Sequence, residues 1–152
     1  MSVTHVIELI ERDLDRLKQN IQAYTDEQFI WKNEGHIKNS GGNLCLHICG
    51  NIQHYLGNII MDNGYVRDRD YEFQGGPETA EALCIRIDAT IKVIRSLEAF
   101  LTPDIIDKEY PLEVLGYKMT TGYFLVHLYG HLNYHLGQIN YHRRILEGEI
   151  VS

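Results

Sequence analysis

The sequence lacks any apolar run near the ~20 residues that a helix needs to cross a bilayer. Residues 1–17 alternate charged and aliphatic side chains, so the continuous apolar core of a signal peptide is missing as well. From both absences we expect a cytoplasmic protein with no membrane partner.

Cysteine and proline are scarce, with three residues of each. The odd number of cysteines gives no sign of a disulfide framework, which favours a reducing compartment. Cys45 and Cys49 lie one helical turn apart, as in half of a metal site, but the chain has just one further cysteine, Cys84. We therefore interpret all three as small, buried core residues.

Basic side chains are also in deficit, because 14 Lys and Arg stand against 21 Asp and Glu, for a formal net charge of -7. The densest basic positions, Arg143–Arg144 and the Arg67/Arg69 pair, have acidic neighbours. Nucleic-acid binding needs a clustered basic patch, so we expect no nucleic-acid partner. At 152 residues and 44% hydrophobic content, the chain has the size of one globular domain, predicted over residues 1–152.

Four stretches place apolar residues at the spacing of amphipathic helices. They cover residues 3–24, 43–62, 77–101 and 120–147. Asn43 is the expected N-cap of the second helix, Pro77 suits the first turn of the third, and Gly148 is expected to close the last.

The connections between these helices are rich in turn residues. Residues 25–31 predict a short turn with a capping box from Thr25 to Gln28. Residues 64–77 predict a long loop, and residues 102–119 predict a small hairpin or an irregular crossover. Together the pattern predicts an all-α fold, a four-helix bundle with long crossover connections.

Histidine is the abundant residue type, with eight in the chain. Six lie in the second and last predicted helices: His47, His54, His127, His131, His135 and His142. An i, i+4 pair on a helix points both rings the same way, so two facing helices could converge three nitrogens on one point. The spacing leaves three interpretations open: a divalent-metal site, a hydrogen-bonded polar layer or a pH-sensitive core.

Two known metal motifs are absent, the Glu-x-x-His pairs of di-iron bundles and the His-Glu-x-x-His of zincins. Small residues accompany the histidines instead. Gly50 or Asn51 shares the face of His47 and is expected to leave a gap beside it. Glycine costs ~1 kcal/mol within a helix, so Gly130 and Gly137 predict a close approach by a neighbouring backbone or a ligand, or a packing role.

Two segments resemble the DinB-like superfamily of small four-helix-bundle proteins. NLCLHICGNIQHYL is similar to the family's second-helix pattern, and HLNYHLGQI to its last-helix pattern of His-x-x-x-His followed by Gly-Gln. The resemblance implies a divalent metal, nickel or zinc, bound by His47, His131 and His135. Three neutral imidazoles would leave it with net positive charge and an open position, as in catalytic sites.

The resemblance also implies a chemistry. Similar proteins are thiol transferases or isomerases that use bacillithiol, mycothiol or glutathione, and others are classed as metal-dependent hydrolases. We therefore expect a metal-dependent transferase or hydrolase that acts on a small molecule. A low-molecular-weight thiol is the expected second substrate of a transferase. The resemblance further implies a homodimer, whose contact face the sequence does not identify.

The family pattern supplies no general acid or base. His127, Tyr134 and Tyr55 are the candidates for a catalytic role, His54 is a neighbour of the triad, and His142 is expected outside it. Two alternatives remain: a metal- or ligand-binding stress-response protein without turnover, and a purely structural bundle whose histidines form a polar layer.

Overall fold

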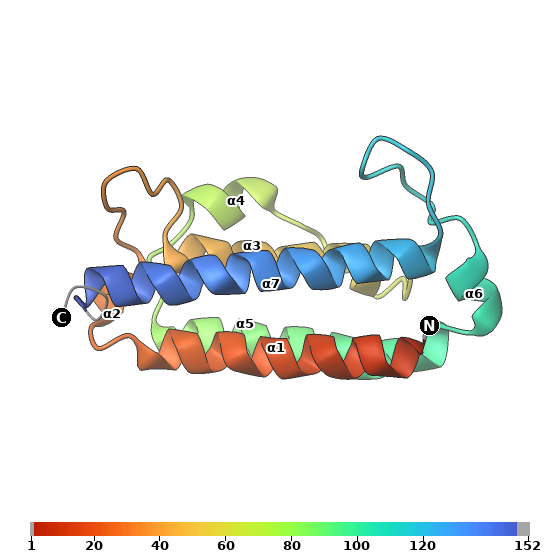
Figure 1. Cartoon of the computed structure of the whole chain (residues 1–152), viewed down its shortest axis with the longest axis horizontal. Coiled ribbons are helices and arrows are strands. Elements are labelled where there is room, and N and C mark those ends of the chain that lie inside the picture. The colour runs from red at the N-terminus through yellow and green to blue at the C-terminus, as the bar shows by residue number, and fades with distance from the viewer. Residues whose placement is uncertain (1, 149–152) are drawn as a thin grey trace.

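The computed structural model describes residues 2–148, and within this range it is helical, with no strand (Figure 1). The helices are α1 (Val3–Ala23), α2 (Glu27–Ile30), α3 (Gly41–Ile52), α4 (Arg69–Gln74), α5 (Ala80–Leu97), α6 (Pro103–Asp107) and α7 (Thr121–Leu146). The prediction of an all-α fold is confirmed. The ends of the predicted 1–152 domain, residue 1 and residues 149–152, lie outside the described residues.

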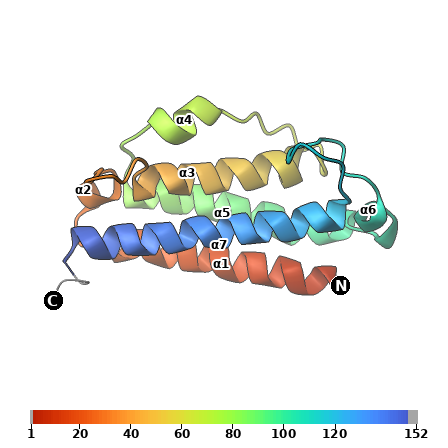
Figure 2. The same cartoon turned by 45° about the horizontal axis from the view of Figure 1, so that its top comes forward.

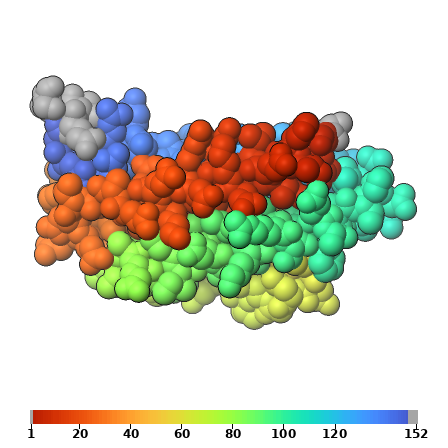
Figure 3. All heavy atoms as spheres, turned by 90° about the horizontal axis from the view of Figure 1, so that it is seen from below, coloured from red at the N-terminus to blue at the C-terminus, as the bar shows by residue number. Residues whose placement is uncertain are grey.

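The four long helices α1, α3, α5 and α7 lie side by side, each packed against neighbours in the group (Figures 1 and 2). In Figure 1, α3 and α7 form the upper layer above α1 and α5, and from below α1 and α5 run next to each other (Figure 3). Helices α1 and α7 run in one direction, and α3 and α5 run in the opposite one. The face of α3 that meets α7 carries the candidate site.

Helix α1 follows its apolar pattern, because Ile10, Leu14, Leu17 and Ile21 are almost completely buried. Burial of such side chains contributes about 1.5–3 kcal/mol each, which outweighs the modest propensity of β-branched residues for helices. The three cysteines are buried and unpaired, as predicted from the sequence. No helix of residues 2–148 is long and apolar enough to cross a membrane.

The predicted starts of one turn and two long helices are wrong, each because a hydroxyl or carboxylate nearby makes the better cap. Asp26, and not Thr25, caps α2 by accepting a hydrogen bond from the Gln28 amide. Ser40 caps α3 through the Asn43 amide, while Thr79 caps α5 at a later position than the expected start.

The two long connections contain helices that the sequence analysis did not predict. Asp68 caps α4, which lies on the outer side of α3 within the connection expected to be a loop (Figure 2). In the second connection Thr102 caps α6, with Pro103 at its first position. This connection is irregular and not a hairpin, since one isolated bridge between Glu109 and Thr120 is the nearest approach to strand pairing among the described residues.

Helix α3 continues into a π-helical segment, η1 (Gln53–Asn58), so the second predicted helix extends close to its expected end. Such π-helical turns are uncommon and frequently occur at functional sites. This one carries His54 and Tyr55 and directly follows the α3 residues that face α7.

Candidate metal centre

Helix α3 supplies the most buried histidine of the site. His47 lies in the middle of α3 with an exposed fraction of 5%. Its ring packs against Phe73 of α4, with the centroids 4.8 Å apart. The histidine is therefore fixed from the α4 side, and its other edge faces α7.

A carboxylate from α4 holds the outer nitrogen of this ring. Nδ1–H of His47 donates to Oε1 of Glu72 over 3.0 Å. Arg67 in turn donates to both oxygens of Glu72, from Nε over 2.8 Å and from Nη2 over 2.9 Å. A bidentate guanidinium–carboxylate pair is among the stronger and more directional contacts in proteins, so this arrangement orients the imidazole.

The expected gap beside His47 is filled by this carboxylate. A side chain at Gly50, about one helical turn after His47 on α3, would collide with the carboxyl group of Glu72. Glu72 is 4% exposed, and burial alone would raise its pKa. The hydrogen bonds from His47 and Arg67 outweigh burial, so the pKa of Glu72 is lowered and the group is ionised at neutral pH.

Helix α7 supplies the other two histidines, one turn apart on the side that faces α3. His131 and His135 are both partly buried, and their ring centroids are 4.5 Å apart. Nδ1–H of His135 donates to Oε1 of Gln138 over 2.7 Å, which fixes this ring as Glu72 fixes His47. Gln138 belongs to the Gly-Gln step of the last-helix pattern.

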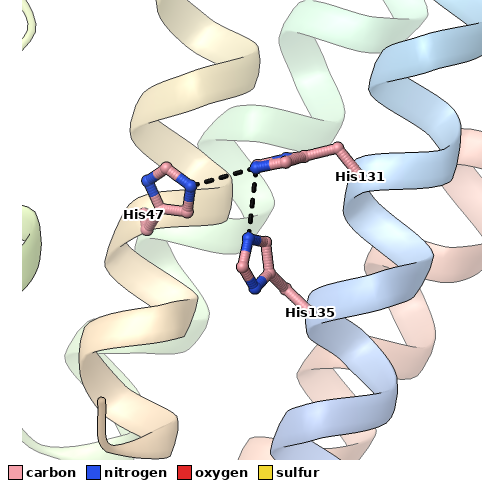
Figure 4. Close-up of side chains that lie close together, drawn as sticks. All are labelled: His47, His131 and His135. Atoms are coloured by element: carbon pink, nitrogen blue, oxygen red, sulfur yellow. Dashed lines mark hydrogen bonds between the residues drawn. The ribbon is translucent and has the colours of Figure 1, made fainter. Parts of the chain in front are cut away.

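The three imidazoles point toward one another, as Figure 4 shows. Nε2 of His131 lies 3.1 Å from Nε2 of His47 and 3.1 Å from Nε2 of His135. The three ligand atoms all lie within 4.8 Å of one another. Nitrogens bound ~2 Å from one tetrahedral ion lie roughly 3.3 Å apart, so this donor set fits a divalent metal ion.

The hydrogen bonds on the outer nitrogens decide where the protons are. His47 and His135 each donate through Nδ1, to Glu72 and Gln138 respectively, so their neutral rings carry a lone pair on Nε2. Both lone pairs face Nε2 of His131, which can carry no more than one proton. At least one of these close nitrogen pairs therefore has no hydrogen between its atoms, whereas a bound cation would satisfy all three lone pairs.

The electrostatics of the site keep the α7 rings neutral. Burial and then the neighbouring imidazoles lower the pKa of His131 to about 3. Burial also lowers the pKa of His135, against the opposing effect of the Gln138 hydrogen bond. Because a metal binds the neutral imidazole, both rings are ready to bind at neutral pH without first losing a proton.

The candidate catalytic residues lie beside the triad and not within it. The His127 ring is exposed, stacks on Phe124 and lies 6.5 Å from the ring of His131, centroid to centroid. It lines a groove of about 510 Å³ with Asp107 and Thr120. The Tyr134 ring lies 5.3 Å from His135 and is 66% exposed.

Arg67 also lies close to Tyr55 of the π-helical segment η1. Its guanidinium lies 5.6 Å from the Tyr55 ring and 3.5 Å from Nδ1 of His47. His54 stacks edge-on against Tyr55 at 4.8 Å, and its buried Nδ1 has no hydrogen-bond partner among the described residues.

His142 lies elsewhere on α7 and bonds to Tyr24 and Lys32.

Arg67 and Glu72 are the site residues that the sequence analysis missed. They belong to a connection read as a loop, 20 and 25 residues beyond His47 respectively. Nothing in the sequence pairs them with a histidine on another element. The one available signal is that Arg67 and Glu72 lie close in sequence as opposite charges, and such pairs are common on surfaces without any functional role.

Comparison with known proteins gives the family. The model of the DinB family matches residues 1–144, which is most of the chain. The chain therefore belongs to the DinB family, as the two histidine segments indicated. No curated protein matches it. Family membership and the three-histidine cluster together describe a DinB protein with a site that could hold a metal ion.

Proposed function

We propose that this protein is a metal-dependent enzyme that acts on a small molecule as a thiol transferase or a hydrolase. The observation that carries the proposal is the convergence of three Nε2 atoms, two of which belong to rings that donate their proton through Nδ1 to Glu72 and Gln138. A structural polar layer would pair each lone pair with a donor, and this cluster cannot. Nickel or zinc suits three imidazole ligands, with the choice depending on metal availability.

The exposure of the site supports turnover over storage. His131 and His135 are partly open to solvent, and the groove beside His127 has a volume within the range of small-molecule sites. A divalent ion held by three neutral imidazoles supplies a Lewis acid that lowers the pKa of a thiol or a water. The low-molecular-weight thiol follows from the family resemblance.

The chain's own residues have defined tasks in this proposal. Glu72 and Gln138 hold the outer protons of two triad rings, which keeps their Nε2 lone pairs aimed at the site. His127 borders the groove and is exposed, so its imidazole is placed to accept or return a proton of a bound substrate. Tyr134 is the second candidate for proton transfer.

A direct assay tests the function. The protein loaded with nickel or zinc is incubated with a low-molecular-weight thiol and either monochlorobimane or an epoxide, and separately with ester substrates. We expect conjugation or hydrolysis that depends on the metal and is lost in His131→Ala. The matched control is His5→Ala, an exposed histidine on α1 far along the sequence from the triad, which should keep the activity.

The alternative is a metal- or ligand-binding protein without turnover. It would be favoured if the fully metal-loaded protein neither conjugates any of the thiols nor hydrolyses any ester. Metal content measured on the same sample separates this outcome from a site that binds no metal at all.

A further inference from the structure

Asn51 is a buried polar side chain that the fold leaves unpaired. It lies one helical turn after His47 on α3 and has an exposed fraction of 7%. Its carboxamide oxygen, Oδ1, is buried and has no hydrogen-bond partner within residues 2–148. A buried polar group without a partner destabilises the folded state, and such groups are rare in proteins. The presence of this one therefore requires an explanation.

Other asparagines of the bundle do have partners. Asn43, on the same helix, accepts a hydrogen bond from Ser40 and donates to two backbone carbonyls of the α4 region. Asn140 of α7 donates to Oδ1 of Asn20 on α1 over 3.0 Å. Each of these carboxamides joins parts of the chain that are distant in sequence or fold next to each other. Asn51 makes no such link through its oxygen, so we look for its partner outside the protein.

The neighbours of Asn51 on α3 show which way it faces. Asn51 comes four residues after His47 and four before Tyr55, so it falls between them on the helix surface. His47 meets His131 of α7, and the Tyr55 ring packs on the Phe124 ring of α7 with the centroids 5.2 Å apart. Because the residues on both sides of it contact α7, Asn51 faces α7 as well.

The same contacts give its level along α7. The two helices run in opposite directions, so later residues of α3 meet earlier residues of α7 (Figures 1 and 2). Asn51 is midway between the contact with the triad and the contact with Phe124. It therefore lies opposite the turn of α7 that holds His127 and Leu128. This position is beside the triad, at the level of the groove that His127 lines.

We propose that Asn51 is a substrate-binding residue, whose carboxamide oxygen accepts a hydrogen bond from an O–H or N–H of the bound small molecule. The proposal rests on the proposed function of the triad and its groove. The last torsion of an asparagine side chain is broad, so a turn of the carboxamide directs Oδ1 toward a ligand in the site. A carboxamide is uncharged, which suits an uncharged hydroxyl or amide group.

This contact gives the site a preference among substrates. A small molecule that carries the hydroxyl or amide group pairs Oδ1, whereas an analogue without it leaves the oxygen buried and unpaired. Sites that hydrogen-bond a substrate group discriminate strongly against analogues that lack the group. The instability that Asn51 causes in the free protein is then offset when the substrate binds.

The stability of the apoprotein tests the proposal without any metal or activity. Asn51→Ala removes an unpaired buried oxygen, so the melting temperature should rise by about 2 °C or more. Asn43→Ala is the matched control on the same helix. It deprives Ser40 and two backbone carbonyls of their partner, so the melting temperature should fall by about 4 °C. Alanine is the better helix former at both positions, so helix propensity does not explain opposite signs.

The binding of a small probe tests the hydrogen bond itself. Acetohydroxamate carries an N–H beside its oxygens, and N-methylacetohydroxamate keeps the oxygens but lacks this N–H. Calorimetric titration into zinc-loaded protein should show acetohydroxamate binding Asn51→Ala about 3- to 10-fold more weakly than the wild type, as expected for one neutral hydrogen bond. The N-methyl compound should bind both proteins alike. Asn140→Ala is the control, because Asn140 pairs with α1, and it should bind both probes as the wild type does.

Each experiment has a result that would overturn the proposal. A melting temperature that falls in Asn51→Ala as it does in Asn43→Ala would show that Asn51 serves the fold. An unchanged affinity for acetohydroxamate, or an equal loss of affinity for both probes, would show that Asn51 gives the ligand no hydrogen bond.

Failure of the proposed function gives a different pattern. If the probes bind as expected but no substrate is turned over, the Asn51 contact stands and the enzymatic activity does not. If the protein takes up no zinc, the metal site fails, and the opposite signs of the two melting-temperature changes alone decide whether Asn51 is kept for a ligand.

Discussion

His142 and His131 lie on the same helix, yet their surroundings are opposite. Both nitrogens of His142 have unlike partners, because Tyr24 O–H donates to Nδ1 and Nε2–H donates to the Lys32 carbonyl, each over 2.7 Å. Nε2 of His131 faces two further imidazole nitrogens at 3.1 Å. A histidine that serves the fold has its hydrogen bonds satisfied by protein, whereas a histidine of the triad has its lone pairs gathered around a common point.

The largest expected effect breaks the triad. His131→Ala removes the ring that contacts both of the others, so metal affinity should fall by well over 100-fold, beyond the roughly 10- to 100-fold typical of residues outside the ligand set. Titration of nickel or zinc into the apoprotein by calorimetry measures the change. His142→Ala is the counterpart on the same helix and should bind the metal as the wild type does. Equal losses in both variants would remove the distinction between the two histidines.

The second effect concerns the residue that orients His47. Glu72→Gln removes the charge that accepts the Nδ1 proton and pairs with Arg67, so we expect metal affinity to fall about 10- to 100-fold. The control is Glu78→Gln, because Glu78 is a carboxylate that pairs with Arg86 and Tyr71 away from the triad. An affinity unchanged by Glu72→Gln would show that α4 serves the fold alone.

The third effect appears at His142. His142→Ala leaves the Tyr24 hydroxyl and the Lys32 carbonyl without their partner in a buried place, which should cost about 1–3 kcal/mol of unfolding free energy. Denaturant unfolding of the apoprotein measures it, with His5→Ala as the exposed control. A loss no greater than that of the control would contradict the structural role.

The smallest effect is the pH dependence of the free energy by which His142 stabilises the fold. Burial lowers the pKa of His142, against the opposing effect of the Lys32 carbonyl. The unfolded chain therefore takes up a proton from about pH 6.5 downward, before the folded chain does. The stabilising effect is complete above that pH and is lost as the pH falls toward the lowered value. The stability difference between the wild type and His142→Ala should shrink from about pH 8 to about pH 5, and a difference that grows would have the wrong sign.

The long helices could be predicted from the sequence because their cores repeat at a helical period. Ile10, Leu14, Leu17 and Ile21 alone define the buried side of α1. The N-caps of the helices were harder to predict, because several polar residues near the start of each helix could serve as the cap. Asn43 looked like the cap of α3, but its side chain instead accepts from Ser40 and donates to carbonyls of the α4 region.

The candidate site could be predicted from the sequence only in part, for a similar reason. The three histidines recur at helical spacing in two segments with a family pattern, so their convergence could be predicted. Glu72 lies on a helix of six residues, too short to show a period. Its contact with His47 is set by how α4 packs on α3 and by the missing side chain at Gly50, which are properties of the folded chain.

The metal content of protein purified without a histidine tag tests the central claim most directly. Elemental analysis should find one divalent ion for each chain in the wild type and none above background in a variant that lacks His47, His131 and His135 but melts as a folded protein. A wild type that remains free of metal after incubation with nickel and with zinc, or a triple variant that binds as much as the wild type, would contradict the account.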